Sequence, residues 1–171
     1  MAKIFNVSAD CKPDLHYMVD ISERLGKIKE LIDRGEYFTI NRARQYGKTT
    51  TLRILKKYLR DEYLVVSLDF QKLDAAKFQD GNIFSLAFAT YFLQVLKREC
   101  VDCSAKMDTE IEMLGDIIRS SPKMFTLFDL FGHLSQICAV SDKPVVLLVD
   151  EVDSAANNQV FLDFLAQLRG Y

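Results

Sequence analysis

The chain has 171 residues, of which 49% are hydrophobic and 27% charged, and its formal net charge is −2. This length suits one domain with a hydrophobic core and is short for two. No run is long and apolar enough to cross a bilayer, and the N-terminus lacks the apolar stretch of a signal peptide, so we expect a cytoplasmic protein without membrane contact. The acidic balance argues against direct nucleic-acid binding by this chain.

The four cysteines are Cys11, Cys100, Cys103 and Cys138. They are too few and too scattered for a disulfide framework. Cys100 and Cys103 have the spacing of half a zinc site, but a closed structural site needs four ligands and no second pair follows. We therefore favour two reduced cysteines near a helix end over a zinc site.

The first third of the chain predicts a helix, a strand and a second helix. Ser22 is placed as the N-cap of an amphipathic helix, and Gly35 stands where a C-terminal cap would be. Glu36–Ile40 reads as a short strand. The helix after it is expected over Lys48–Leu59, where apolar residues recur at helical spacing.

The remainder predicts two buried strands separated by helices. The strands are Tyr63–Phe70 and Val145–Val149, both apolar enough to be covered on two faces. The helices are expected at about 83–99, from about 108 through 118, at 125–140 and at 159–168. Strands that alternate with helices predict an α/β fold around a parallel sheet.

Gly47-Lys48-Thr49 lies between the first predicted strand and its following helix, as a phosphate-binding loop requires. The helix N-terminus favours an anion, the lysine can reach the β- and γ-phosphates, and the Thr49 hydroxyl can ligate Mg²⁺. The alternative is an ordinary helix that happens to begin with Gly-Lys-Thr. In favour of that alternative, Arg42 stands where the motif G-x-x-x-x-G-K-[ST] has its first glycine.

Asp150 and Glu151 follow the apolar run Val145–Val149, at the end of a strand where open α/β sheets bind ligands. There Asp150 would hold Mg²⁺, and Glu151 would orient or deprotonate the attacking water. An acidic turn after a strand is the alternative for this pair alone. Two neighbouring carboxylates, Asp69 and Asp153, are interpreted as helix-capping or turn residues.

The segment Thr39-Ile-Asn-Arg-Ala-Arg-Gln-Tyr-Gly-Lys-Thr-Thr-Thr-Leu52 resembles the phosphate loop of the bacterial AAA-ATPase-like family, whose members carry R-x-R-x-[FY]-G-K-T. His16–Ser22 and Leu147–Asp153 also resemble its members. The resemblance implies that the loop is a functional variant. The residues it assigns to the triphosphate are Arg42, Ala43, Arg44, Gln45, Tyr46, Gly47, Lys48, Thr49 and Thr50.

The resemblance also implies the architecture: a P-loop NTPase three-layer sandwich over residues 1–171, incomplete after the acidic strand and one helix. Family members usually continue through further strands, and many end in a PD-(D/E)XK nuclease-like domain. We expect a protein partner or self-association to cover the incomplete sheet. Tyr17 and Met18 could flank the adenine, although ordinary core positions are the favoured interpretation for both.

The function expected from these residues is Mg²⁺-dependent ATP binding, with ATP hydrolysis by the complete parent protein. Lys48 and Glu151 would carry the catalysis, and Thr49 and Asp150 would hold the metal. The alternative is a nucleotide-binding interaction module without turnover, because no arginine finger can be assigned; Arg169 is the only late candidate. A kinase-like transfer to another acceptor ranks below both.

Overall fold

The computed structural model describes residues 4, 15, 17, 19–41, 47–100 and 103–170. They form two compact units, Met1–Asp61 and Glu62–Tyr171, and each is described by itself. The expectation that residues 1–171 make a single P-loop domain stays a prediction. No helix within the described ranges is both long and apolar enough to cross a membrane.

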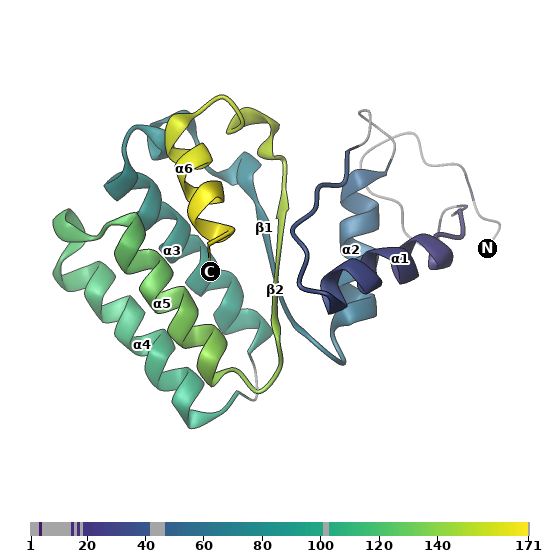
Figure 1. Cartoon of the computed structure of the whole chain (residues 1–171), viewed down its shortest axis with the longest axis horizontal. Coiled ribbons are helices and arrows are strands. Elements are labelled where there is room, and N and C mark those ends of the chain that lie inside the picture. Colours follow the sequence, from purple (N-terminus) through teal and green to yellow (C-terminus); the bar gives the residue numbers. More distant parts are fainter. Residues whose placement is uncertain are drawn as a thin grey trace. The chain divides into compact units, whose positions relative to one another are not determined.

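The first unit contains two helices, α1 (Ser22–Asp33) and α2 (Lys48–Leu59), which contact each other (Figure 1). Ser22 is the first helical residue and not the cap: the Asp20 carboxylate accepts hydrogen bonds from both its N–H, at 2.9 Å, and its hydroxyl, at 2.6 Å. These bonds lower the pKa of Asp20. Gly35 follows α1 with φ of +67°, which confirms its predicted role as the left-handed residue after the helix.

The strand predicted at Glu36–Ile40 is wrong, because residues 36–41 have no regular secondary structure. A strand is stable when its backbone groups pair with a neighbour. In the described part of the chain the only sheet ladder joins two other segments, so this segment takes part in no ladder. Tyr37, in the middle of this segment, is 58% exposed.

The second unit is an α/β structure with a two-stranded parallel sheet. Its strands are β1 (Leu64–Asp69) and β2 (Val145–Asp150), close to the predicted ranges. The four helices of this unit lie on one side of the strands (Figure 1). They are α3 (Gly81–Glu99), α4 (Ala105–Ser120), α5 (Leu127–Val140) and α6 (Gln159–Leu168), as the periodicity predicted within a few residues.

Short 3₁₀ turns connect the helices and strands of this unit, at Phe70–Lys72, Ala75–Phe78, Pro122–Met124 and Val152–Ser154. The α/β class and the parallel sheet are confirmed; the three-layer sandwich stays a prediction.

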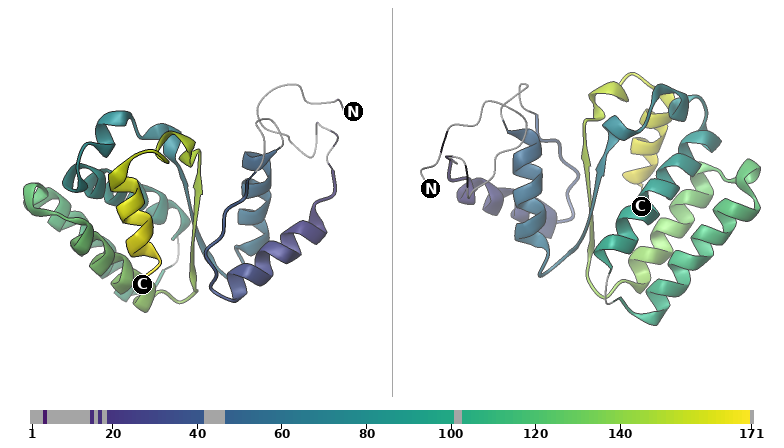
Figure 2. Two further views of the ribbon diagram at one scale, coloured as in Figure 1. Left: turned by 45° about the horizontal axis from the view of Figure 1, so that its top comes forward. Right: turned by 180° about the vertical axis from the view of Figure 1, so that it is seen from behind.

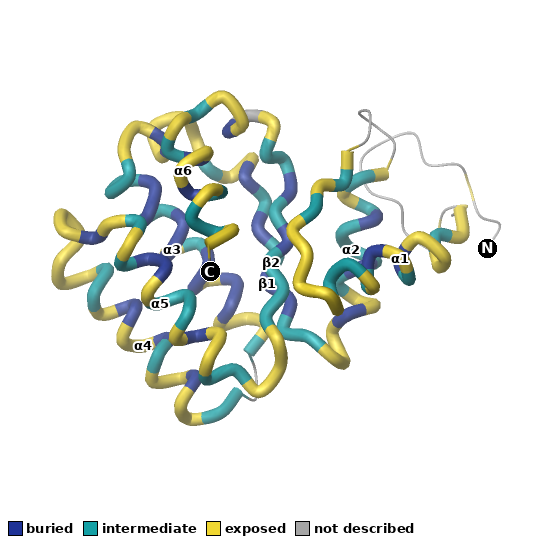
Figure 3. Tube along the Cα trace, in the orientation of Figure 1, coloured by how far each residue is buried: buried dark blue, intermediate teal, exposed yellow. Residues whose placement is uncertain are grey.

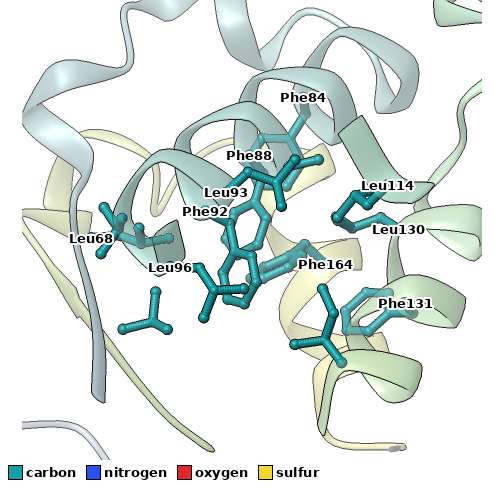
Figure 4. Close-up of a cluster of buried hydrophobic side chains, with 14 of the residues drawn as sticks. Leu68, Phe84, Phe88, Phe92, Leu93, Leu96, Leu114, Leu130, Phe131 and Phe164 are labelled. Atoms are coloured by element: carbon teal, nitrogen blue, oxygen red, sulfur yellow. The ribbon is translucent and has the colours of Figure 1, made fainter. Parts of the chain in front are cut away.

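The core of this unit is an aromatic cluster between the sheet and the helices. Alternate residues of β1, Val66 and Leu68, face it, and so do Leu147 and Val149 of β2. Phe84, Phe88 and Phe92 enter it from α3, Phe131 from α5 and Phe164 from α6 (Figure 4). Figure 3 shows the buried positions along the inner faces of these elements and the exposed ones outside.

The side chains of residues just before three of these helices define where the helices start. The carboxylate of Asp80 accepts a hydrogen bond from the N–H of Ile83, and the amide oxygen of Asn158 accepts one from Val160. At α5, Thr126 and Asp129 form a reciprocal capping box. The hydrogen bond from the Thr126 hydroxyl, with a second from its N–H, lowers the pKa of Asp129.

Replacing Thr126 by alanine is expected to lower the free energy of unfolding by about 1 kcal/mol, the usual value of an N-cap. Thr126→Ser keeps the hydroxyl and is expected to stay close to the parent. Because the folded pKa of Asp129 lies below its unfolded pKa, the carboxylate stabilises the fold above the unfolded value, and this contribution is lost as the pH falls through the folded value. Urea unfolding should therefore show the difference between Thr126→Ala and Thr126→Ser shrinking on acidification; a constant difference would contradict the capping box.

The prediction that Cys100 and Cys103 are reduced is wrong. Cys100 and Cys103 form a disulfide between the end of α3 and the start of α4, with their Cα atoms 5.2 Å apart. The spacing of two intervening residues brings the thiols together once the chain turns between the helices. A bridged pair offers no thiolate to zinc, so in this form it is not half of a metal site. Cys138 is a free cysteine on α5, and burial raises the pKa of its thiol.

Candidate functional site: a glycine-initiated helix and an acidic strand end

Helix α2 starts at a glycine in a left-handed conformation. Gly47 is the N-cap residue, with φ of 73° and ψ of 29°, a region that glycine enters at little cost. Its carbonyl accepts the first helical hydrogen bond, from the N–H of Thr51 at 2.8 Å. Within the described residues no side chain caps this helix, and its first turn carries no acidic residue. The lack of a side-chain cap distinguishes α2 from α3 to α6, each of which has one. The positive end of its dipole therefore has no carboxylate in its own first turn.

The predicted phosphate-binding residues lie on the first turn of α2. Lys48 and Thr50 are half-buried, and Thr49 is exposed. Thr51, one position further, is buried and was not among the residues predicted to bind phosphate. The other predicted residues of the loop, Arg42, Ala43, Arg44, Gln45 and Tyr46, lie outside the described residues.

Two carboxylates come together at the carboxyl end of the sheet in the second unit. The parallel register pairs Asp69, the last residue of β1, with Asp150, the last residue of β2. Successive residues of a strand point to opposite faces of the sheet, and Leu68 and Val149, the residues just before the two aspartates, face the aromatic cluster. Both aspartates therefore belong to the opposite face of the sheet. Asp150 is only 8% exposed, and its Oδ1 accepts a hydrogen bond from the N–H of Glu151 at 2.9 Å.

Glu151 is the one non-glycine residue with positive φ in the described part of the chain, at φ of 57° and ψ of 38°. This left-handed conformation costs an L-residue about 1 kcal/mol or more. It turns the chain sharply out of β2, which lets the Glu151 N–H bond the carboxylate of the preceding residue. The strand periodicity gave no signal for this turn.

Asp69 is held by two different groups. Its Oδ1 accepts a hydrogen bond from the N–H of Gln71 at 3.0 Å and caps the 3₁₀ turn that follows, which confirms the capping interpretation. Its own N–H donates to the phenol oxygen of Tyr91 on α3, at 3.1 Å. Tyr91 was not singled out from the sequence, because a contact between residues so far apart leaves no local pattern. Asp153 lies within the turn after β2, while Asn158 caps the next helix.

The donor set can be tested against Mg²⁺ by its chemistry. No three His, Cys, Asp or Glu side chains within the described ranges gather closely enough to hold a metal ion by themselves. Mg²⁺ does not require such a cage, because it keeps several waters and binds through one or two carboxylates together with substrate phosphates. A strand-end aspartate such as Asp150 is an oxygen donor of the kind this mode uses.

Comparison with known protein families gives one match, to the AAA-like domain, over residues 17–171. The chain belongs to the AAA-like domain family. No curated protein and no solved structure matches significantly. Membership confirms the AAA-like resemblance at the level of the family; the R-x-R loop variant and the fusion to a nuclease-like domain stay predictions.

Within this AAA-like domain, the candidate residues form two local groups. Gly47, Lys48 and Thr49 gather at the start of α2 in the first unit, and Asp150 and Glu151 gather at the end of β2 in the second. Two further candidates are not part of either group. Tyr17 is 57% exposed, contrary to the core position favoured for it, and Arg169 is exposed at the end of α6. Met18 lies outside the described residues.

Proposed function

We propose that this AAA-like domain binds ATP together with Mg²⁺ and that ATP hydrolysis is an activity of the complete protein. The observation that carries the proposal is the start of α2: a left-handed glycine at the N-cap, followed at once by lysine and threonine. Family membership adds support, since an AAA-like domain is consistent with nucleotide binding or ATPase activity.

The electrostatics of α2 favour phosphate at its N-terminus. The helix dipole is equivalent to about half a positive charge there, and the lysine side chain adds a full one. A carboxylate cap or an acidic first turn would compete with a phosphate, and α2 has neither. Gly47 has no neighbouring atom within 4 Å of where a Cβ would stand, so its left-handed backbone, and not crowding, is the reason a glycine is required.

The end of β2 supports the metal role. Asp150 is almost buried yet lies at the strand's carboxyl end, and the Glu151 N–H holds one of its oxygens. Such a bond helps to fix the orientation of the carboxylate at the end of the strand. Bound Mg²⁺ would supply charge neutralisation on the β- and γ-phosphates.

Each side chain then has one role. Lys48 binds the phosphates and stabilises their charge. Thr49 and Asp150 hold the metal. Glu151 orients the attacking water and accepts its proton. Glu151 is half-buried, and its backbone is left-handed where the chain leaves β2. Its position at the end of the strand is therefore set by the fold.

Replacing Asp150 by asparagine is expected to remove the effect of Mg²⁺ on ATP affinity and to leave Mg²⁺-free ATP binding nearly unchanged, because the side-chain shape is kept while its charge is lost. The measurement is an ATP titration by calorimetry with Mg²⁺ and with a chelator. Asp153→Asn, two residues beyond Glu151 and exposed, is the matched control. An Asp150→Asn domain that still gains affinity from Mg²⁺ would contradict the metal assignment.

A second function, nucleotide binding without turnover, is favoured by one feature of the sheet. In the described residues β2 pairs with β1 alone, so its other edge carries no strand, and a partner could bind there in a nucleotide-dependent way. A measurement of phosphate release distinguishes ATP hydrolysis from nucleotide binding without turnover. Hydrolysis that is lost in Glu151→Gln supports the ATPase, whereas binding without any release of phosphate supports the interaction module.

A further inference from the structure

We propose that the second unit carries a self-association surface in which the acidic face of α4 from one copy docks into a lysine-rimmed groove of another copy. The groove and the acidic face are both on this chain. The groove shares Tyr91 with the end of β1, but neither surface includes a residue to which a nucleotide or metal role is assigned. Both lie in the Glu62–Tyr171 unit. Figure 2 shows α3 and α4 side by side in this unit from behind.

The groove runs between α3 and the turns that follow β1, and its volume is about 470 Å³. Its floor is apolar, made of Leu73, Ile83 and Leu86 together with the ring of Tyr91. Lys72 and Lys77 are exposed on its sides, and the described residues that line it include no acid. A groove of this character suits a segment with an apolar side chain flanked by carboxylates.

The two lysines have no carboxylate partner in the described part of the chain. The Lys72 ammonium lies over the ring of Tyr91, 5.6 Å from its centroid, and Lys77 forms no ion pair there. Asp80 caps α3, and Asp74, which lies between the two lysines in sequence, is exposed. Neither lysine forms an ion pair with an acid of the described residues.

Helix α4 presents the complementary surface. Asp108 and Glu112 are exposed one helical turn apart and form no ion pair within the described ranges. Met113, an exposed large hydrophobic residue at 47% exposure, lies beside this acidic stripe, one turn before Asp116. A methionine adapts its shape to an apolar floor and makes favourable contacts with an aromatic ring such as that of Tyr91.

Both surfaces face solvent on the same unit, whose inner faces are occupied by the aromatic core. Two copies can therefore pair the groove of one with the acidic face of the other. The contact joins two different surfaces. If it is made twice between two copies it gives a two-fold pair, and if it is made once per pair it is heterologous and leaves one groove open. Exposed ion pairs contribute little each, so a weak association that depends on salt is expected.

The test is sedimentation of the whole chain over micromolar to sub-millimolar concentrations at low salt. The parent is expected to associate, and both Lys72→Glu/Lys77→Glu and Asp108→Lys/Glu112→Lys are expected to stay monomeric. In an equimolar mixture of these two variants, the intact acidic face of the first can dock into the intact groove of the second. The mixture is therefore expected to associate again. Lys123→Glu changes an exposed lysine that does not line the groove; it is the control and should associate like the parent.

Four results would overturn the proposal. The first three are a parent that is monomeric at every concentration, charge variants that associate as the parent does, and a mixture of the two variants that does not associate although each alone is folded by circular dichroism. Loss of association in Lys123→Glu would also overturn it, because the effect would then come from net charge and not from the groove. None of these results depends on nucleotide binding.

Discussion

Replacing Lys48 by alanine is expected to weaken Mg²⁺·ATP binding by about 10- to 100-fold, since a hydrogen bond to a charged group contributes about 1.5–3 kcal/mol. Lys48 is the first residue of α2, immediately after the left-handed Gly47, and the only basic residue in that turn. The measurement is calorimetric titration of both proteins with Mg²⁺·ATP.

The control for this variant is Lys57→Ala. Lys57 is exposed in the last turn of the same helix, so its removal changes the net charge equally without touching the N-terminus. It is expected to bind ATP like the parent. Equal losses in the two variants would show that general charge attraction, and not a phosphate site, holds the nucleotide.

Replacing Phe164 by alanine is expected to lower the free energy of unfolding by about 4 kcal/mol, the usual cost of removing a buried aromatic side chain and leaving a cavity. Phe164 is fully buried on α6. Its ring centroid lies 4.8 Å from that of Phe88, 5.3 Å from that of Phe84 and 5.4 Å from that of Phe131. These contacts come from two other helices, so the substitution loosens three elements at once (Figure 4).

Urea unfolding followed by circular dichroism measures this loss. Leu162→Ala is the matched control, because Leu162 is on the same helix and 46% exposed. Its effect is expected to stay within about 0.5 kcal/mol. A small effect of Phe164→Ala, comparable with that of Leu162→Ala, would contradict the description of α6 as part of the core.

The elements of the second unit could be predicted because their signals are local. Apolar runs bounded by polar residues predicted β1 and β2, and helical spacing predicted α6 at its observed bounds. The failed strand at Glu36–Ile40 has the same kind of local signal. Its failure shows that pairing, a property of two segments, decides whether an extended segment becomes a strand.

The site was predicted in part for the same reason. The Gly47 turn and the strand-end Asp150 follow from residue type and position. The pairing of Asp69 with Asp150 and the Tyr91 hydroxyl on Asp69 depend on contacts across the fold. The left-handed Glu151 could not be foreseen, because glutamate has no preference for that conformation.

The most direct test of the central claim, that this AAA-like domain binds ATP with Mg²⁺, is calorimetric titration of the unmodified chain with ATP in the presence and absence of Mg²⁺. The account predicts saturable binding in the micromolar to sub-millimolar range, tightened by Mg²⁺. A folded sample that takes up no ATP under either condition would contradict it.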